Sequence, residues 1–162
     1  MSSPSIDVVA YSDGNIIPVN FSKKFNYSET DNNQLIMQVL KDAGKKRTNI
    51  HVLSVDGKEY GFLSVSFQCR EFQKKQPPKK ILNIDYLFVS EPFRKKKVSA
   101  FENKKTSEML VYIAISIANK IRQFVPVEFI TAEPAHDKIA PLYSNVGFEP
   151  LINRSNVLFL KL

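Results

Sequence analysis

The sequence predicts a mixed α/β fold with one long crossover helix. Short segments rich in β-branched and aromatic residues recur between turn residues, as strands do. Two other segments repeat their apolar residues at helical spacing, and the segment around residues 109–121 is apolar along one broad stripe. Strands and helices alternating in this way are typical of a mixed sheet crossed by a central helix.

The first part of the chain predicts a strand, a helix and a hairpin. Residues 6–19 contain β-type pieces interrupted by Asp13-Gly14 and Pro18, so we expect the first strand there. Residues 31–43 are expected to form a helix, because their apolar residues fall on one helical face. Gly44 can end that helix because glycine accepts left-handed backbone angles. Residues 50–55 and 60–67 flank the dipeptide Asp56-Gly57, which is a strong hairpin signal.

The remaining elements follow in order. Residues 73–80 hold prolines and lysines and are expected to form an exposed connection before a strand at 81–89. After the central helix we expect a strand at 127–132, a short helix at 134–145 and a last strand at 156–160.

Length and composition bound the class of protein. A chain of 162 residues with 43% hydrophobic content fits a single domain spanning residues 1–162. Because no apolar run is long enough for a secretory signal or a membrane span, we expect a soluble cytoplasmic protein without a membrane partner. Cys69 is the only cysteine, which excludes an internal disulfide and a multi-cysteine zinc site, and we expect no metal.

The formal net charge is +7, and the basic residues are clustered. The clusters are Lys23-Lys24, Lys45-Lys46-Arg47, Lys74-Lys75, Lys79-Lys80, Arg94 to Lys97, and Lys104-Lys105. They predict a polyanionic partner such as a phosphorylated cofactor, a nucleic acid or an acidic protein. The other interpretation is a solvated surface that keeps the protein soluble.

One motif carries a family resemblance. Residues 142–148 read LYSNVGF and follow an expected strand and short helix. They resemble the tyrosine, glycine and phenylalanine signature of the GCN5-related N-acetyltransferases (GNAT family), matched by Tyr143, Gly147 and Phe148. The resemblance implies a GNAT-like acyl-CoA N-acyltransferase fold, direct acetyl transfer from acetyl-CoA to a primary amine, and a catalytic Tyr143 beside the thioester sulfur. Judged without the resemblance, a tyrosine before such a helix end is usually a core or rim residue.

Other site residues follow from the same resemblance. Leu87, Phe88 and Val89 are similar to the end of the family's fourth strand, whose backbone binds the pantetheine arm and polarises the acetyl carbonyl. His136 stands where the family often has a pantetheine-binding asparagine. Asp85, Glu133 and His136 are candidates for a general base, although positioning of both substrates can make a base unnecessary.

The family's phosphate loop is matched least well. Counting on from the expected fourth strand aligns the family's loop motif with the residues that start at Arg94, and counting back from the central helix aligns it with those that start at Glu102. The disagreement implies an insertion. Both alignments place a lysine where the first loop glycine belongs. We expect the phosphates to be bound by basic side chains and by the start of the central helix instead. These residues are Arg94, Lys95, Lys97, Lys104, Lys105, Thr106 and Ser107. The alternative is a loop that no longer binds acetyl-CoA.

The order of segments along the chain suggests the acceptor. The segment Phe25 to Ser28, the following helix, the Lys45 to Arg47 cluster and the last strand resemble GNAT toxins of toxin-antitoxin pairs. That resemblance implies the α-amine of aminoacyl-tRNA as acceptor, an antitoxin protein as partner, and allows a homodimer. Two alternatives stay open, namely an acetyltransferase for a protein lysine or a small amine, and a catalytically silent binding module.

Overall fold

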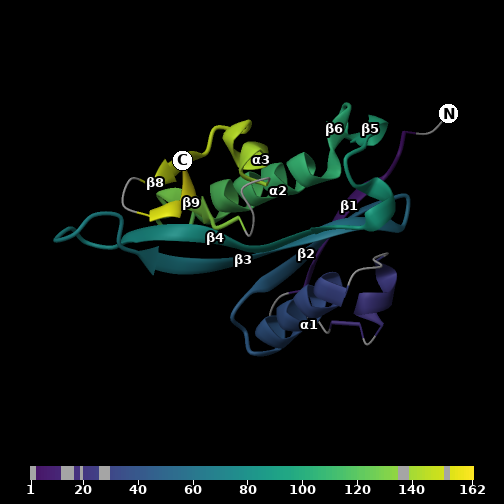
Figure 1. The fold of residues 1–162 in the computed structure, drawn as a ribbon, viewed down its shortest axis with the longest axis horizontal. Helices are drawn as coiled ribbons and strands as arrows, with labels where there is room; N and C mark the ends of the chain where they lie inside the picture. The colour runs from purple at the N-terminus through teal and green to yellow at the C-terminus, as the bar shows by residue number, and fades with distance from the viewer. Residues whose placement is uncertain (1–2, 12–16, 19, 26–29, 135–138, 152–153) are drawn as a thin grey trace. The chain divides into compact units, whose positions relative to one another are not determined.

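The computed structural model describes residues 3–11, 17–18, 20–25, 30–134, 139–151 and 154–162 (Figure 1). In chain order the elements are β1 (Ile6–Tyr11), the 3-10 turn η1 (Phe21–Lys24), α1 (Thr30–Gly44), β2 (Asn49–Val55), β3 (Lys58–Arg70), β4 (Lys79–Val89), η2 (Glu91–Phe93), β5 (Lys97–Val98), η3 (Ser99–Phe101), β6 (Lys104–Lys105), α2 (Thr106–Ile121), β7 (Phe129–Ala132), α3 (Ala140–Ser144), β8 (Glu149–Leu151) and β9 (Arg154–Lys161). A seven-stranded sheet has the order β1-β2-β3-β4-β7-β9-β8, and β5 pairs with β6 in a separate ribbon.

The chain divides into two compact units. The first unit consists of residues 1–64 and 86–110, and the second of residues 65–85 and 111–162. Strands β3 and β4 and helix α2 therefore contribute residues to both. The expectation of one domain over residues 1–162 stays a prediction.

In the first unit, α1 lies against β2 and closes an aromatic-rich core (Figure 1). The core cluster contains Phe21, Phe25, Ile36, Val39, Ile50, Val52, Phe62 and Phe88. The rings of Phe25, Phe62 and Phe88 pack with centroids 5.3 to 5.9 Å apart. Such aromatic contacts add to the stability gained from burial. The short turn η1, which brings Phe21 into this core, was not predicted.

The backbone angles at the β2–β3 turn and at the end of α1 test two turn predictions made from the sequence. Asp56 and Gly57 both have positive φ angles, 50° and 80°, so the predicted hairpin turn is confirmed. Helix α1 ends at Gly44 as predicted, but the left-handed residue that follows the helix is Lys46, with φ of 59°, and not Gly44. The amide of Arg47 then donates to the carbonyl of Asp42 at 2.9 Å, which completes the cap.

In the second unit, β4 and β7 pair in parallel from Ile81↔Phe129 to Ile84↔Ala132. Strand β9 pairs antiparallel with β7 on its other side, and β8 pairs with β9. Leu82, Ile84, Ile130 and Ala132 are all buried. They point to the opposite face from Asn83 and Thr131 because successive strand residues alternate.

The predicted mixed α/β fold with a central helix is confirmed. Strands β3 and β4 are both longer than predicted. Because β4 already begins at Lys79, the connection expected at residues 73–80 ends earlier than predicted. Strand β8 was missed, since Pro150 weakens its strand signal. Within the described part of the chain, no helix has the length and apolar character needed to cross a membrane.

Candidate functional site

Tyr143 lies in α3 of the second unit, where the predicted motif forms a tight turn. Its ring packs edge to face on Phe148 with centroids 5.3 Å apart. The amide of Phe148 donates to the Tyr143 carbonyl at 3.0 Å, and Gly147 has a φ of 112°. A side chain at position 147 would be strained at that angle, so the glycine of the motif has a clear structural function.

The phenol of Tyr143 is kept protonated by its surroundings. Only 4% of the residue is exposed, and this burial raises the pKa of Tyr143 to about 12. Among the described residues, none forms a hydrogen bond with its hydroxyl. The hydroxyl is therefore a neutral donor at physiological pH.

In the first unit, the end of β4 is held by the chain's own groups. Phe88 is buried in the core, and its carbonyl oxygen faces Gly61, where an added Cβ would lie 2.4 Å away. The Nε atom of Arg94 donates to the carbonyl of Val89 at 2.9 Å. The carbonyl of Val89 is thus engaged by Arg94, and the carbonyl of Phe88 leaves no room for a side chain at position 61.

The segment between β4 and α2, where the sequence implied an insertion, forms the small β5–β6 ribbon. Lys97 pairs with Lys105, so both lysines at the expected glycine positions have extended backbones. The open turns are made by other residues, namely Lys95, Glu102 and Asn103, with φ between 54° and 63°. Non-glycine residues therefore supply the left-handed conformations of this loop, at a cost in backbone strain.

Helix α2 begins at Thr106, directly after this ribbon. The Thr106 side chain is fully buried, and its Oγ1 atom has no hydrogen-bond partner. Across the described part of the chain, only two other buried side-chain atoms lack a hydrogen-bond partner, namely Asn32 Nδ2 and Ser64 Oγ. An unsatisfied hydroxyl at the positive end of a 16-residue helix is suited to an anion oxygen.

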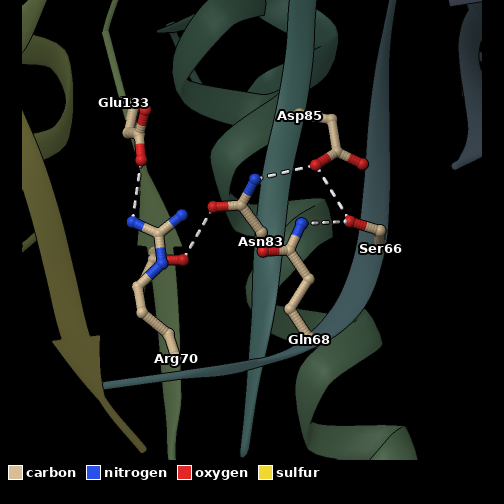
Figure 2. A network of polar contacts seen from close by, with 7 residues as sticks. Ser66, Gln68, Arg70, Asn83, Asp85 and Glu133 are labelled. Carbon is tan, nitrogen blue, oxygen red and sulfur yellow. Dashed lines mark hydrogen bonds and ion pairs between the residues drawn. The ribbon is translucent and has the colours of Figure 1, made fainter. Parts of the chain in front are cut away.

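The two carboxylates predicted as bases lie in a row of polar side chains in the second unit (Figure 2). Asp85 Oδ1 accepts from Ser66 Oγ at 2.9 Å and from Asn83 Nδ2 at 2.7 Å. Glu133 Oε1 instead forms an ion pair with Arg70 Nη1 at 2.8 Å. Glu133 is thus held by a cation and Asp85 by hydrogen bonds, while His136 lies outside the described residues.

Sequence reasoning missed the partners of Asp85. Asn83 and Thr131 are buried polar residues inside otherwise apolar strands, and Thr131 Oγ1 donates to Asn83 Oδ1 at 2.7 Å. A polar residue in an apolar strand is a visible signal, because buried polar groups need partners. No cluster of His, Cys, Asp or Glu that could hold a metal occurs among the described residues.

Comparison with known proteins identifies the fold. No family model and no curated protein matches the chain. A tyrosine-to-phenylalanine mutant of the toxin AtaT, bound to acetyl-CoA and the C-terminus of the antitoxin AtaR, matches with a TM-score of 0.74 and 15% identity over 99% of this chain and 94% of that one. AtaT complexed with acetyl-methionyl-tRNAfMet matches with a TM-score of 0.74 and 14% identity, over 97% of this chain and 95% of that one.

A third structure is similar to the same extent. The KacTA–DNA complex contains a chain that matches with a TM-score of 0.68 and 20% identity, over 98% of this chain and 92% of that one. At these identities the likeness shows the fold, and it confirms the GNAT-like architecture that the Tyr143 motif implied.

Proposed function

We propose that the protein is an acetyl-CoA-dependent N-acetyltransferase that acts on a primary amine. The observation that carries the proposal is the Tyr143 motif, which forms the expected helix end and holds a protonated phenol. Its support is the fold shared with toxins solved in complex with acetyl-CoA.

The proposed reaction is a direct transfer. The amine nitrogen attacks the thioester carbonyl carbon, the new C–N bond forms, and the C–S bond breaks with its electron pair going to sulfur. The nitrogen loses a proton and the thiolate gains one. With a pKa of about 12, the Tyr143 phenol gives up its proton less readily than a thiol of ordinary pKa, about 8.5. Tyr143 therefore acts first as a hydrogen-bond donor that stabilises the leaving sulfur.

Acetyl-CoA supplies the activated acetyl group, and residues of the first unit would hold its phosphates. These are Arg94, Lys95, Lys97, Lys104, Lys105, Thr106 and Ser107. The buried Thr106 hydroxyl without a partner supports this assignment, because a phosphate oxygen would satisfy it. Leu87, Phe88 and Val89 are proposed to bind the pantetheine arm through their backbone groups.

For the acceptor we propose the α-amine of aminoacyl-tRNA, which would make the protein a toxin paired with an antitoxin. The net charge of +7 favours a polyanionic acceptor, since phosphate contacts supply sequence-independent affinity for RNA. The toxin AtaT, which shares the fold, was solved with acetyl-methionyl-tRNAfMet.

Two measurements test the proposal. Calorimetry with acetyl-CoA should show binding to the wild type, and its absence at millimolar cofactor would leave a silent binding module. Incubation with acetyl-CoA and charged tRNA should add one acetyl group to the aminoacyl end, detected by mass. Tyr143→Phe should lower this rate about 10- to 1000-fold while cofactor binding persists. Acetylation of protein lysines or small amines alone would overturn the tRNA assignment and keep the enzyme.

A further inference from the structure

Tyr60, near the beginning of β3, contacts two turns of the segment that joins β4 to α2. Its ring stacks on Phe93 of η2, with centroids 3.7 Å apart and ring planes 8° from parallel. The same ring packs edge to face on Phe101 of η3, with centroids 5.9 Å apart. All three residues belong to the first unit. One side chain of the sheet therefore packs against both of these turns.

Backbone hydrogen bonds connect Tyr60 to the first of these turns as well. The Ser90 amide donates to the Tyr60 carbonyl at 2.9 Å, and the Phe93 amide donates to the Ser90 carbonyl at 2.9 Å. Ser90 and Phe101 are both buried. The Lys58 ammonium lies 5.3 Å from the centre of the Phe93 ring, which adds a cation–π contact. The stacked pair is thus fixed by contacts on the backbone and on the rings.

The segment that these turns belong to is both strained and basic. Lys95, Glu102 and Asn103 have left-handed backbone angles, which persist in non-glycine residues where the surrounding structure holds them. Arg94 directly follows Phe93, and Glu102 directly follows Phe101. The two rings that contact Tyr60 therefore lie at the residues where the basic cluster and the strained turn begin.

We propose that Tyr60 is a positioning residue for acetyl-CoA: through Phe93 and Phe101 it holds residues 94–105 in the conformation that binds the cofactor's phosphates. This inference rests on the proposed acetyltransferase function and adds to it a residue outside the proposed phosphate loop. A loop that occupies its binding conformation for only part of the time binds more weakly by that fraction. Loss of the Tyr60 ring lowers that fraction and leaves the chemical step unchanged.

Calorimetry with acetyl-CoA and steady-state kinetics with charged tRNA test this role. Tyr60→Leu should raise the Kd for acetyl-CoA about 3- to 10-fold, as expected for the loss of aromatic contacts that hold the loop. At saturating acetyl-CoA, kcat should stay within about 2-fold of the wild type. Tyr60→Phe keeps the ring and should bind acetyl-CoA like the wild type. Phe93→Leu removes the same stack from the side of the loop and should also raise the Kd.

A donor without phosphates separates this role from a general loss of structure. S-acetylpantetheine carries the thioester without the phosphates, so Tyr60→Leu should change its kcat/KM by less than about 2-fold. Tyr11→Leu is the matched control, because the Tyr11 ring packs edge to face on Phe21 in the same unit, with centroids 6.1 Å apart. It should lower the stability in urea unfolding without changing the Kd for acetyl-CoA.

The outcomes distinguish this inference from the proposed function. If the wild type binds acetyl-CoA and transfers the acetyl group while Tyr60→Leu and Phe93→Leu bind it equally well, the role of Tyr60 is overturned and the acetyltransferase is kept. Equal losses with acetyl-CoA and S-acetylpantetheine would also overturn it. If the wild type does not bind acetyl-CoA, both inferences fail. Should Tyr60→Leu not fold, Phe93→Leu decides the question, because Phe93 is only half-buried.

Discussion

The guanidinium of Arg94 folds back on the strand that precedes it. Its Nε atom donates to the carbonyl of Val89 at 2.9 Å, and its central carbon lies 5.3 Å from the centre of the Phe88 ring. Arg94 is thus fixed by a hydrogen bond and a cation–π contact at the point where the proposed phosphate loop begins. A fixed guanidinium loses less entropy when it binds a phosphate than a mobile lysine does.

Arg94→Ala should therefore weaken acetyl-CoA binding about 10-fold, as expected for loss of one charge-assisted hydrogen bond. Arg94→Lys should fall between the wild type and the alanine variant, because lysine keeps the charge without the planar fork. Calorimetry measures both, and Lys120→Ala on exposed α2 surface is the charge-matched control. Tighter binding by Arg94→Ala would instead show that Arg94 blocks a carbonyl that the pantetheine arm requires.

Removing the buried Thr106 hydroxyl should stabilise the free protein and weaken its binding of the cofactor. Thr106→Val removes an unsatisfied buried oxygen and should stabilise the free protein by about 1 kcal/mol in urea unfolding. It should also weaken acetyl-CoA binding if that oxygen meets a phosphate. Ser64→Ala removes the other unsatisfied buried hydroxyl, on β3, and should stabilise the protein without changing cofactor affinity. Unchanged affinity in both variants would remove Thr106 from the proposed site.

Prediction from the sequence succeeded where local chemistry decides the structure. The Asp56-Gly57 turn and the Tyr143 to Phe148 motif were predictable because turn geometry restricts residue choice. The β5–β6 ribbon was not predicted, since Lys97 and Lys105 have no strand signal. The polar row was not predictable, because its partners lie far apart along the chain: the residue numbers of Ser66 and Asp85 differ by 19, and those of Asn83 and Thr131 by 48.

Strain in the proposed phosphate loop gives a third prediction. Glu102 has a φ of 54° and ends the short turn η3 in the left-handed region. Its ion pair with Lys104 spans 3.4 Å, and the Glu102 side chain is 89% exposed, so the pair adds little stability. Glu102→Gly should raise the free energy of unfolding by about 0.5 to 1 kcal/mol, because glycine adopts this angle without strain. Glu102→Ala should give no such gain, and equal effects of the two substitutions would show that the loop is not strained there.

The raised pKa of Tyr143 predicts how stability changes in alkali. Burial raises this pKa to about 12 from an ordinary value of 10.0, so the folded state holds the phenol proton more tightly than the unfolded state does. The stabilisation is therefore complete below pH 10 and is lost as the pH rises from 10 to 12. Between pH 8 and pH 11 the wild type should lose about 1 to 1.5 kcal/mol more than Tyr143→Phe in urea unfolding.

Tyr112→Phe on α2 is a control for the loss of one phenol, since Tyr112 is 41% exposed. The same titration bears on catalysis, because a phenol that stays protonated can donate to the leaving sulfur throughout the range below pH 11. Acetyl transfer that requires Tyr143 should therefore show no loss from its ionisation up to about pH 11. Equal alkaline losses of stability in the wild type and Tyr143→Phe would mean that the phenol is solvated in the folded protein, and its enclosed position beside Phe148 would then be wrong.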